Sequence, residues 1–299
     1  MPREIQVKSV LNKSKRRDHW FLDDYTMNPY GSCSFNCLYC YIRGSKYGSN
    51  LSEQLTVKTN ALEVLERQLS SRAKKGEFGF IVLSSATDPY IKVEEKYQLT
   101  RGALEIILKY RFPVHIITKS TMVSRDFDLL HEIDRRAILP SDLNWIGRGS
   151  ILTFSFSCLD DQIGKVFEPG APQPSERLQA LQQSVEQNFL SGVSLMPLLP
   201  YISDTGEQLD MYFNDFKELG ALYLFPAGTT LFGSGKGSSR DLVFAAIEKH
   251  YPEHIARYQK LFGQSDSLPT YYHQAFQRKV RALSLQYGLP LSIQEAVRK

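Results

Sequence analysis

The stretch Cys33-Ser34-Phe35-Asn36-Cys37-Leu38-Tyr39-Cys40 holds three of the four cysteines of the chain. A short loop with this spacing can turn three thiolates toward one face of a metal cluster, and thiolate is the ligand that iron–sulfur clusters take. A fully ligated [4Fe–4S] cluster uses four cysteines, and the remaining one, Cys158, is expected on a distant strand. We therefore expect Cys33, Cys37 and Cys40 to bind a [4Fe–4S] cluster in which one iron stays open to a substrate or cofactor.

Two simpler interpretations of these cysteines stay open. A structural zinc site would need a fourth cysteine or histidine at the spacing of such sites, and the nearest histidines are His19 and His115. Three unligated thiols are the other interpretation. A disulfide framework explains the pattern poorly, because three cysteines crowd together and only one lies elsewhere. This distribution of cysteines fits a protein of a reducing compartment.

With 299 residues, 42% hydrophobic and 23% charged, the chain has the composition of a globular protein, long enough for one large barrel or two ordinary domains. The net charge of +4 is mild and lies in short clusters such as residues 13–17, so nucleic-acid binding is permitted but not indicated. No stretch approaches the roughly 20 apolar residues of a membrane-spanning helix, and the polar N-terminus lacks the apolar core of a signal peptide. We expect no membrane partner and a cytoplasmic location.

Short β-rich runs alternate with longer segments whose apolar residues recur at helical spacing, as in βα units around a parallel sheet. The runs predicted as strands are residues 25–30, 80–83, 114–118, 151–157, 193–195 and 221–225. Six such units are too few to close an eight-stranded barrel. They predict an α/β fold, an incomplete (β/α)6 TIM-like barrel with its functional loops at the carboxyl ends of the strands.

The same pattern divides the chain into three regions. Residues 1–24 precede the first predicted strand as an N-terminal extension, and residues 25–235 make up the partial barrel. A Gly/Ser-rich stretch at 233–239 marks a loop, and beyond it residues 243–261 and 271–287 are predicted as helices. We expect residues 236–299 to form a C-terminal helical extension packed on the barrel.

Within the predicted strand 151–157, residues 152–157 alternate strictly between apolar and hydroxyl-bearing side chains. Phe154 and Phe156 share one face of the predicted strand, and Ser155 and Ser157 share the other. We expect the apolar face to pack against helices and the hydroxyl face to line the barrel lumen. Lys119 follows the third predicted strand, at a carboxyl end where its cation would face the same lumen.

The Cys33-x3-Cys37-x2-Cys40 spacing, with aromatic Tyr39 before the last cysteine, resembles the signature of the radical S-adenosylmethionine (SAM) superfamily. The wider context resembles its spore photoproduct lyase-like ("DNA repair photolyase") family, over about residues 5–290. The matching residues are Asn28-Pro29-Tyr30, Tyr41, Thr87-Asp88-Pro89-Tyr90, Glu94, Thr100-Arg101, Thr118-Lys119-Ser120, Arg125-Asp126, Glu168-Pro169, Arg177-Leu178, Pro197, Pro200 and Asp204.

This resemblance implies that SAM binds the open iron and is cleaved reductively to a 5′-deoxyadenosyl radical, with an electron from a ferredoxin- or flavodoxin-like donor. It also implies that Tyr39, Tyr41, Lys119 and Ser155 contact SAM. Without the resemblance, Lys119 is better explained as a solvated strand-end lysine, and Ser155 equally well as a hydroxyl that fills the barrel. The Gly-Gly-Glu-type stretch common in the superfamily is absent, and residues 84–88 stand in its place.

The predicted function is that of a radical SAM enzyme acting on an unknown substrate, with no catalytic residue assigned beyond the cofactor site. One alternative is a lyase that repairs nucleic-acid lesions, for which residues 13–20 are the only early basic and aromatic segment. The other is a non-catalytic iron–sulfur electron carrier or scaffold.

Two further expectations concern single positions. In spore photoproduct lyase a cysteine two residues before an aspartate returns a hydrogen atom to the product radical, and the matching residue before Asp88 is Ala86. We therefore expect that this chain is not a spore photoproduct lyase. Glu168 and Arg177 are either an ion pair that orders the loop after the fourth predicted strand or an exposed pair of little energetic value.

Overall fold

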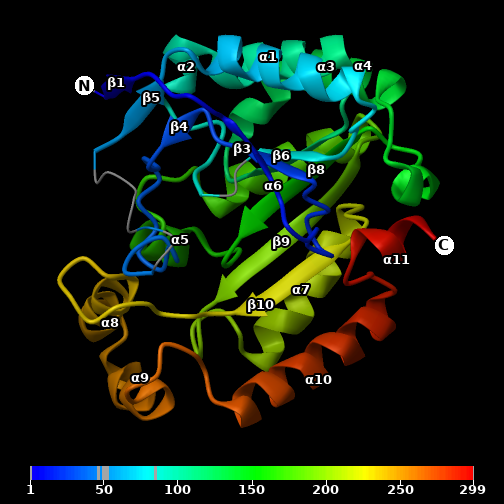
Figure 1. Ribbon diagram of the computed structural model, residues 1–299. Coiled ribbons are helices and arrows are strands. Elements are labelled where there is room, and N and C mark those ends of the chain that lie inside the picture. The colour runs from blue at the N-terminus through cyan, green and yellow to red at the C-terminus, as the bar shows by residue number, and fades with distance from the viewer. Residues whose placement is uncertain (1, 46–47, 49–53, 84–85, 299) are drawn as a thin grey trace.

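The computed structural model describes residues 2–45, 48, 54–83 and 86–298, and a seven-stranded sheet lies at its centre (Figure 1). The strand order is β10-β9-β8-β7-β6-β3-β2, and every neighbouring pair is parallel except β2 and β3. The strands are β2 Leu11–Lys13, β3 Tyr25–Met27, β6 Ile81–Leu83, β7 Val114–Thr118, β8 Ser150–Phe156, β9 Leu190–Leu198 and β10 Leu224–Gly228. The six parallel strands and the open ends of the sheet confirm the predicted incomplete (β/α)6 barrel.

The first predicted strand, residues 25–30, is in fact two strands. Pro29, which has no backbone N–H to donate, separates β3 from β4 (Tyr30–Gly31). β4 leaves the main sheet and pairs with β5 (Thr56–Lys58), which also pairs with β1 (Arg3–Ile5). The cysteine loop therefore starts from a small separate sheet, and the first 24 residues supply strands to both sheets.

The last predicted strand, residues 221–225, is displaced toward the C-terminus and becomes β10. The predicted strand ended at Phe225, before Pro226 and Gly228, which are residue types that are uncommon inside strands. β10 is an edge strand, where proline is tolerated because one side of the backbone has no partner, and its pairing with β9 is irregular between Pro226 and Gly228. β9 is longer than the predicted 193–195 at both ends.

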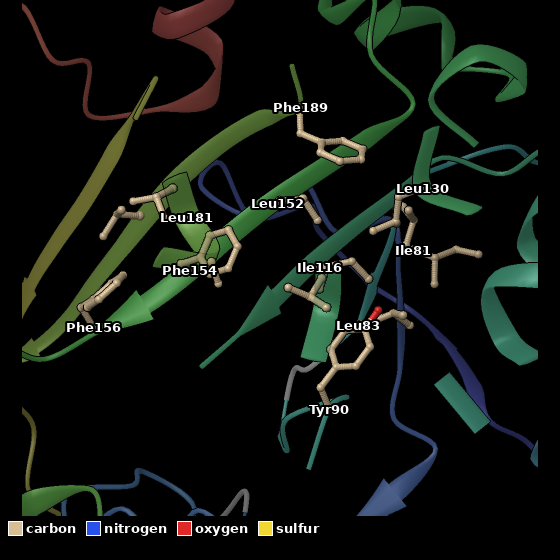
Figure 2. Close-up of a cluster of buried hydrophobic side chains, with 14 of the residues drawn as sticks. Ile81, Leu83, Tyr90, Ile116, Leu130, Leu152, Phe154, Phe156, Leu181 and Phe189 are labelled. Atoms are coloured by element: carbon tan, nitrogen blue, oxygen red, sulfur yellow. The ribbon is translucent and has the colours of Figure 1, made fainter. Parts of the chain in front are cut away.

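Helices cover the outer face of the sheet, with α1 beside α3 and α7 beside α10 (Figure 1). Figure 2 shows Phe154 and Phe156 of β8 on this face with Leu181 of α6, which confirms the predicted alternation of β8. The α-helices are α1 Ala61–Lys74, α2 Glu94–Tyr97, α3 Leu99–Tyr110, α4 Phe127–Arg136, α5 Asp161–Phe167, α6 Pro174–Glu186, α7 Gly206–Glu218, α8 Ser239–His250, α9 Ile255–Phe262, α10 Thr270–Tyr287 and α11 Ile293–Val297.

The helix predicted over residues 243–261 is broken, because Pro252 lacks an N–H and cannot continue a helical ladder. α8 ends before it, the short 3₁₀ helix η3 (Pro252–His254) turns the chain, and α9 follows. α8 and α9 pack beside the cysteine loop through Phe167 and Tyr39, whereas α10 packs on α7. Within the described ranges, no helix combines the length and the apolar character needed to cross a bilayer.

Residues 13–20 lie at the amino ends of the strands, at the opposite end of the barrel from the cysteines. The Trp20 ring stacks on Phe225 of β10 at a centroid distance of 5.5 Å. Next to it, the backbone carbonyl of Phe21 is 2.7 Å from Nδ1 of His115, whose Nε2 is 2.6 Å from the Thr153 hydroxyl. The N-terminal segment therefore closes the floor of the lumen.

Burial of His115 makes stability depend on pH. Burial lowers the pKa of His115 from 6.5 to about 4, with only partial opposition from the Phe21 carbonyl. Between these pH values the unfolded chain binds a proton at His115 that the folded chain does not bind. The contribution of His115 to the free energy of unfolding is therefore fully present above pH 6.5 and is lost as the pH falls toward 4. The slope attributable to this group is about 1.4 kcal/mol per pH unit.

We predict that His115→Gln removes this contribution, because glutamine does not titrate. Urea unfolding of parent and variant between pH 7 and pH 4.5 measures the two slopes. A parent whose stability falls no faster than that of the variant over this range would contradict the prediction.

Candidate functional site

The three clustered cysteines open onto one cavity of about 430 Å³ at the carboxyl ends of the strands. Cys33, Cys37 and Cys40 are free thiols with partial exposure, whereas Cys158 is buried and is not among the described residues that line the cavity. The predicted cofactor residues, Tyr39, Tyr41, Lys119 and Ser155, all line the same cavity. The fold thus brings together every site residue that the sequence singled out.

The cysteine loop is held by contacts along its own backbone. The Arg43 guanidinium folds back to donate to the Cys37 carbonyl at 3.3 Å and to the side chain of Asn36. Asn36 has a positive φ of 54°, a conformation that asparagine tolerates better than most residues. Gly44, with φ of 86°, lets the loop approach Phe232, since a Cβ there would lie 2.7 Å from the Phe232 carbonyl oxygen.

Two hydrogen bonds attach the cysteine loop to the segment after α5. Leu38 N–H donates to the Phe167 carbonyl at 2.9 Å, and Gly170 N–H donates to the Phe35 carbonyl at 2.9 Å. A Cβ on Gly170 would lie only 2.4 Å from the Ser34 carbonyl oxygen. The loop therefore depends on a glycine more than a hundred residues away in the sequence.

The donor set fits an iron–sulfur cluster better than a single ion. In the described part of the chain, no three or more Cys, His, Asp or Glu side chains gather where one metal ion could bind them. A cubane does not require such convergence, because its thiolates bind different irons. Burial, reinforced by the nearby Asp88, raises the pKa of Cys33 to about 12, and burial likewise raises the pKa of Cys37. Cluster binding would therefore release protons from these thiols.

Lys119 and Ser155 meet across the neighbouring strands β7 and β8. The Lys119 ammonium donates to the Ser155 hydroxyl at 2.6 Å. The turn that carries Lys119 is fixed by the buried carboxylate of Asp88, which accepts from the Lys119 N–H and the Thr118 hydroxyl, each at 2.8 Å. Asp88 therefore orients a cavity residue. Ser84 and Ser85 lie outside the described residues.

Glu168 and Arg177, for which the sequence left two interpretations open, form a buried pair beside this cavity. Their side chains are 1% and 0% exposed, so the interpretation as an exposed pair is wrong. Glu168 also accepts from the Tyr39 hydroxyl and from the Ser157 hydroxyl, the latter at 2.9 Å. The pair therefore links the cysteine loop to β8 and α6.

A second buried carboxylate, Glu94, lies on the other side of the cysteine loop. It accepts from the Tyr30 hydroxyl, from Arg125 at 2.8 Å and from the Thr100 N–H at 2.9 Å. It thus joins the strand before the cysteine loop to the start of α3. Its partners are not among the described residues that line the cavity. This network therefore holds the strand before the cysteine loop without contributing to the cavity wall.

The remaining cavity wall comes from β9, from β10 and from the residues that follow β10. This wall is uncharged, and Tyr41, which also lines the cavity, is 42% exposed. In the sequence, only Pro197 of this wall belongs to the residues that carry the resemblance, and the other signal is the rule that functional residues gather at the carboxyl ends of barrel strands. The wall residues are Met196, Pro197, Ala227, Gly228, Thr230 and Phe232.

Comparison with known proteins finds relatives by sequence, although no protein-family model matches the chain. An uncharacterized protein of Mycobacterium tuberculosis is 28% identical over 293 residues, covering 96% of this chain and 81% of the relative. One of Methanocaldococcus jannaschii is 27% identical over 232 residues, covering 73% of this chain and 78% of the relative. A radical SAM Nalpha-GlyT isomerase of Pseudomonas phage M6 is 21% identical over 198 residues, covering 66% of this chain and 38% of the relative.

Spore photoproduct lyase has the same fold among solved structures. A variant with bound AdoMet and dinucleoside spore photoproduct matches with a TM-score of 0.60 and 15% identity, covering 94% of this chain and 79% of the lyase. Another variant, with dinucleoside spore photoproduct, matches with a TM-score of 0.63 and 16% identity, covering 97% of this chain and 79% of the lyase. These matches confirm the predicted resemblance to spore photoproduct lyase-like radical SAM proteins.

The close packing at Gly170 gives a test of how the cysteine loop is held. We predict that Gly170→Ala displaces the loop, lowers the iron bound per chain and destabilises the fold by roughly 1–3 kcal/mol, because the backbone it meets cannot rotate away. Gly235→Ala is the matched control, since its methyl group meets nothing within 4 Å. Iron analysis after anaerobic reconstitution and urea unfolding measure both effects, and equal values for the two variants would contradict the prediction.

Proposed function

We propose that the chain is a radical SAM enzyme in which Cys33, Cys37 and Cys40 hold a [4Fe–4S] cluster and SAM occupies the adjoining cavity. The observation that carries this proposal is the convergence of three free thiols, Lys119 and Ser155 on one cavity at the carboxyl ends of the strands. The fold shared with spore photoproduct lyase supports it. When bound, the cluster and SAM would supply a 5′-deoxyadenosyl radical that removes hydrogen from a substrate.

The side chains around the cavity suit the binding of SAM. The Lys119 ammonium can pair with the carboxylate of SAM, and the Ser155 hydroxyl can hydrogen-bond its polar groups. Tyr39 and Tyr41 present rings from the cysteine loop against which a purine can pack. The uncharged wall from β9 and β10 lines the cavity opposite them and excludes water from the reacting groups.

A one-electron donor completes the proposed reaction. A ferredoxin- or flavodoxin-like protein would supply this electron, as the resemblance to radical SAM enzymes implies. The substrate is a molecule whose reacting carbon reaches the cavity past Tyr41. We assign no catalytic residue for the steps that follow the removal of hydrogen from the substrate.

We predict that anaerobically reconstituted protein binds about four irons per chain and converts SAM to 5′-deoxyadenosine when reduced. Alanine at Cys33, Cys37 or Cys40 should abolish both, because each removes one of the three thiolates. Cys158→Ala is the control and should retain both. Iron and sulfide analysis with chromatography of the nucleoside products measures them.

Two results would contradict the proposal in different ways. One tightly bound zinc without sulfide would replace the cluster with a structural metal. A normal cluster with no SAM cleavage would instead make the protein an electron carrier or scaffold.

Repair of a nucleic-acid lesion is the second candidate function, because the solved structures that share this fold carry dinucleoside spore photoproduct. Three features count against it. Ala86, at the position that aligns with the hydrogen-donating cysteine of that family, lines the cavity, and the thiol of Cys158 lies outside the described lining. The basic segment at residues 13–20 lies at the opposite end of the barrel, so it cannot border the cavity.

We predict that the protein does not restore thymines from a dinucleoside spore photoproduct over many turnovers, because its cavity lacks the thiol that would return a hydrogen atom. Chromatography of the products, with 5′-deoxyadenosine as a measure of SAM cleavage, tests this. The Ala86→Cys variant serves as the matched comparison. Efficient repair by the parent protein would establish the lyase function.

A further inference from the structure

The carboxylate of Glu168 accepts from three donors, and two of them occupy Oε1, the oxygen nearer Lys119. Arg177 binds Oε2, and the hydroxyls of Tyr39 and Ser157 both bind Oε1. Burial alone would raise the pKa of Glu168, but Arg177, Lys119 and Tyr39 together lower it to about 2, so the group is ionised.

Lys119 lies close to this carboxylate without binding it. Its Nζ is 3.7 Å from Oε1 of Glu168, beyond hydrogen-bonding distance, and it donates instead to the Ser155 hydroxyl at 2.6 Å. Its side chain is 12% exposed and lines the cavity. The ammonium therefore keeps donors for a ligand.

The charges of this group show what Arg177 contributes. Glu168 carries −1 and Arg177 and Lys119 carry +1 each, so Arg177 balances the carboxylate and leaves the charge of Lys119 unmatched by it. A second carboxylate, Asp88, also lines the cavity and accepts from the backbone N–H of Lys119. Arg177 is fully buried, and its guanidinium donates hydrogen bonds to Glu168, to the Ser155 carbonyl and to the Pro172 carbonyl. Without Arg177, the ionised carboxylate would have Lys119 as its nearest cation and would draw it out of the cavity.

We propose that Arg177 balances the charge of Glu168 while Tyr39 and Ser157 occupy its Oε1, and that this keeps the Lys119 ammonium available to bind the carboxylate of the cofactor. Arg177 and Glu168 are then positioning residues for the SAM site. This inference rests on the function proposed above. It adds that the buried pair controls where the cavity cation points, beyond holding the cysteine loop in place.

The test exploits the opposite effects of removing one partner or both. Arg177→Met leaves Glu168 to capture Lys119, so the dissociation constant of SAM should rise at least tenfold. Adding Glu168→Gln removes the competing carboxylate, so the double variant should return to within about threefold of the parent. A purely structural role for the pair predicts that the double variant binds SAM no better than Arg177→Met.

The control is the buried carboxylate of Glu94, which pairs with the partly exposed Arg125. Arg125 also binds Asp126, which keeps Arg101 as a second cation. Arg125→Met therefore leaves the Glu94 carboxylate without this cation, and no described contact joins Glu94 to Lys119. Its SAM affinity should stay within about threefold of the parent. Ser157→Ala, alone and with Glu168→Gln, repeats the test with a smaller change if Arg177→Met does not fold.

SAM binding is measured by titrating the paramagnetic signal of the reduced cluster, and urea unfolding records stability separately. A crystal structure of the cluster-free Arg177→Met protein gives a readout without cofactor, in which Lys119 Nζ should lie within hydrogen-bonding distance of Glu168. A parent protein whose reduced cluster does not respond to SAM would overturn the proposed function itself. A responsive parent with equal weakening in Arg177→Met and Arg125→Met, or with no recovery in the double variant, would overturn this inference alone.

Discussion

The site depends on one physical constraint, which is that a carboxylate buried away from water must be surrounded by donors and cations. Glu168 meets this requirement by drawing Tyr39 from the cysteine loop, Ser157 from the end of β8 and Arg177 from α6 into one network. Losing Arg177 leaves the charge of Glu168 without its paired cation, and losing either hydroxyl removes one of its hydrogen bonds. The position of the cysteine loop is therefore fixed by the protein itself, before any cofactor binds.

Local patterns in the sequence were sufficient to predict the barrel and the loop of three cysteines, and the family resemblance added the predicted SAM contacts. The strict alternation of residues 152–157 determined which face of β8 lies in the lumen, and the rule that strand ends converge placed Lys119 beside Ser155. The spacing of Cys33, Cys37 and Cys40 within one loop required no knowledge of distant contacts. Each of these inferences depends only on residues that lie close together in the sequence.

Features that depend on distant partners could not be predicted in the same way. Tyr39 and Glu168 are 129 residues apart, and nothing near either residue indicates the other. The pairing of β4 with β5 and the edge position of β10, which tolerates Pro226, follow from the whole sheet. The break at Pro252 is the exception, since a proline within residues 243–261 could have indicated two helices.

The open sheet has a consequence for how the lumen is sized. A closed barrel has a radius fixed by its strand number and shear, and that radius changes only in discrete steps. Here the edge strands β10 and β2 are not paired with each other, and Trp20, which follows β2 in the chain, spans toward β10 by stacking on Phe225. The contact toward β10 is thus made by aromatic side chains and not by backbone hydrogen bonds, so a substitution at Trp20 can alter it without breaking a strand ladder.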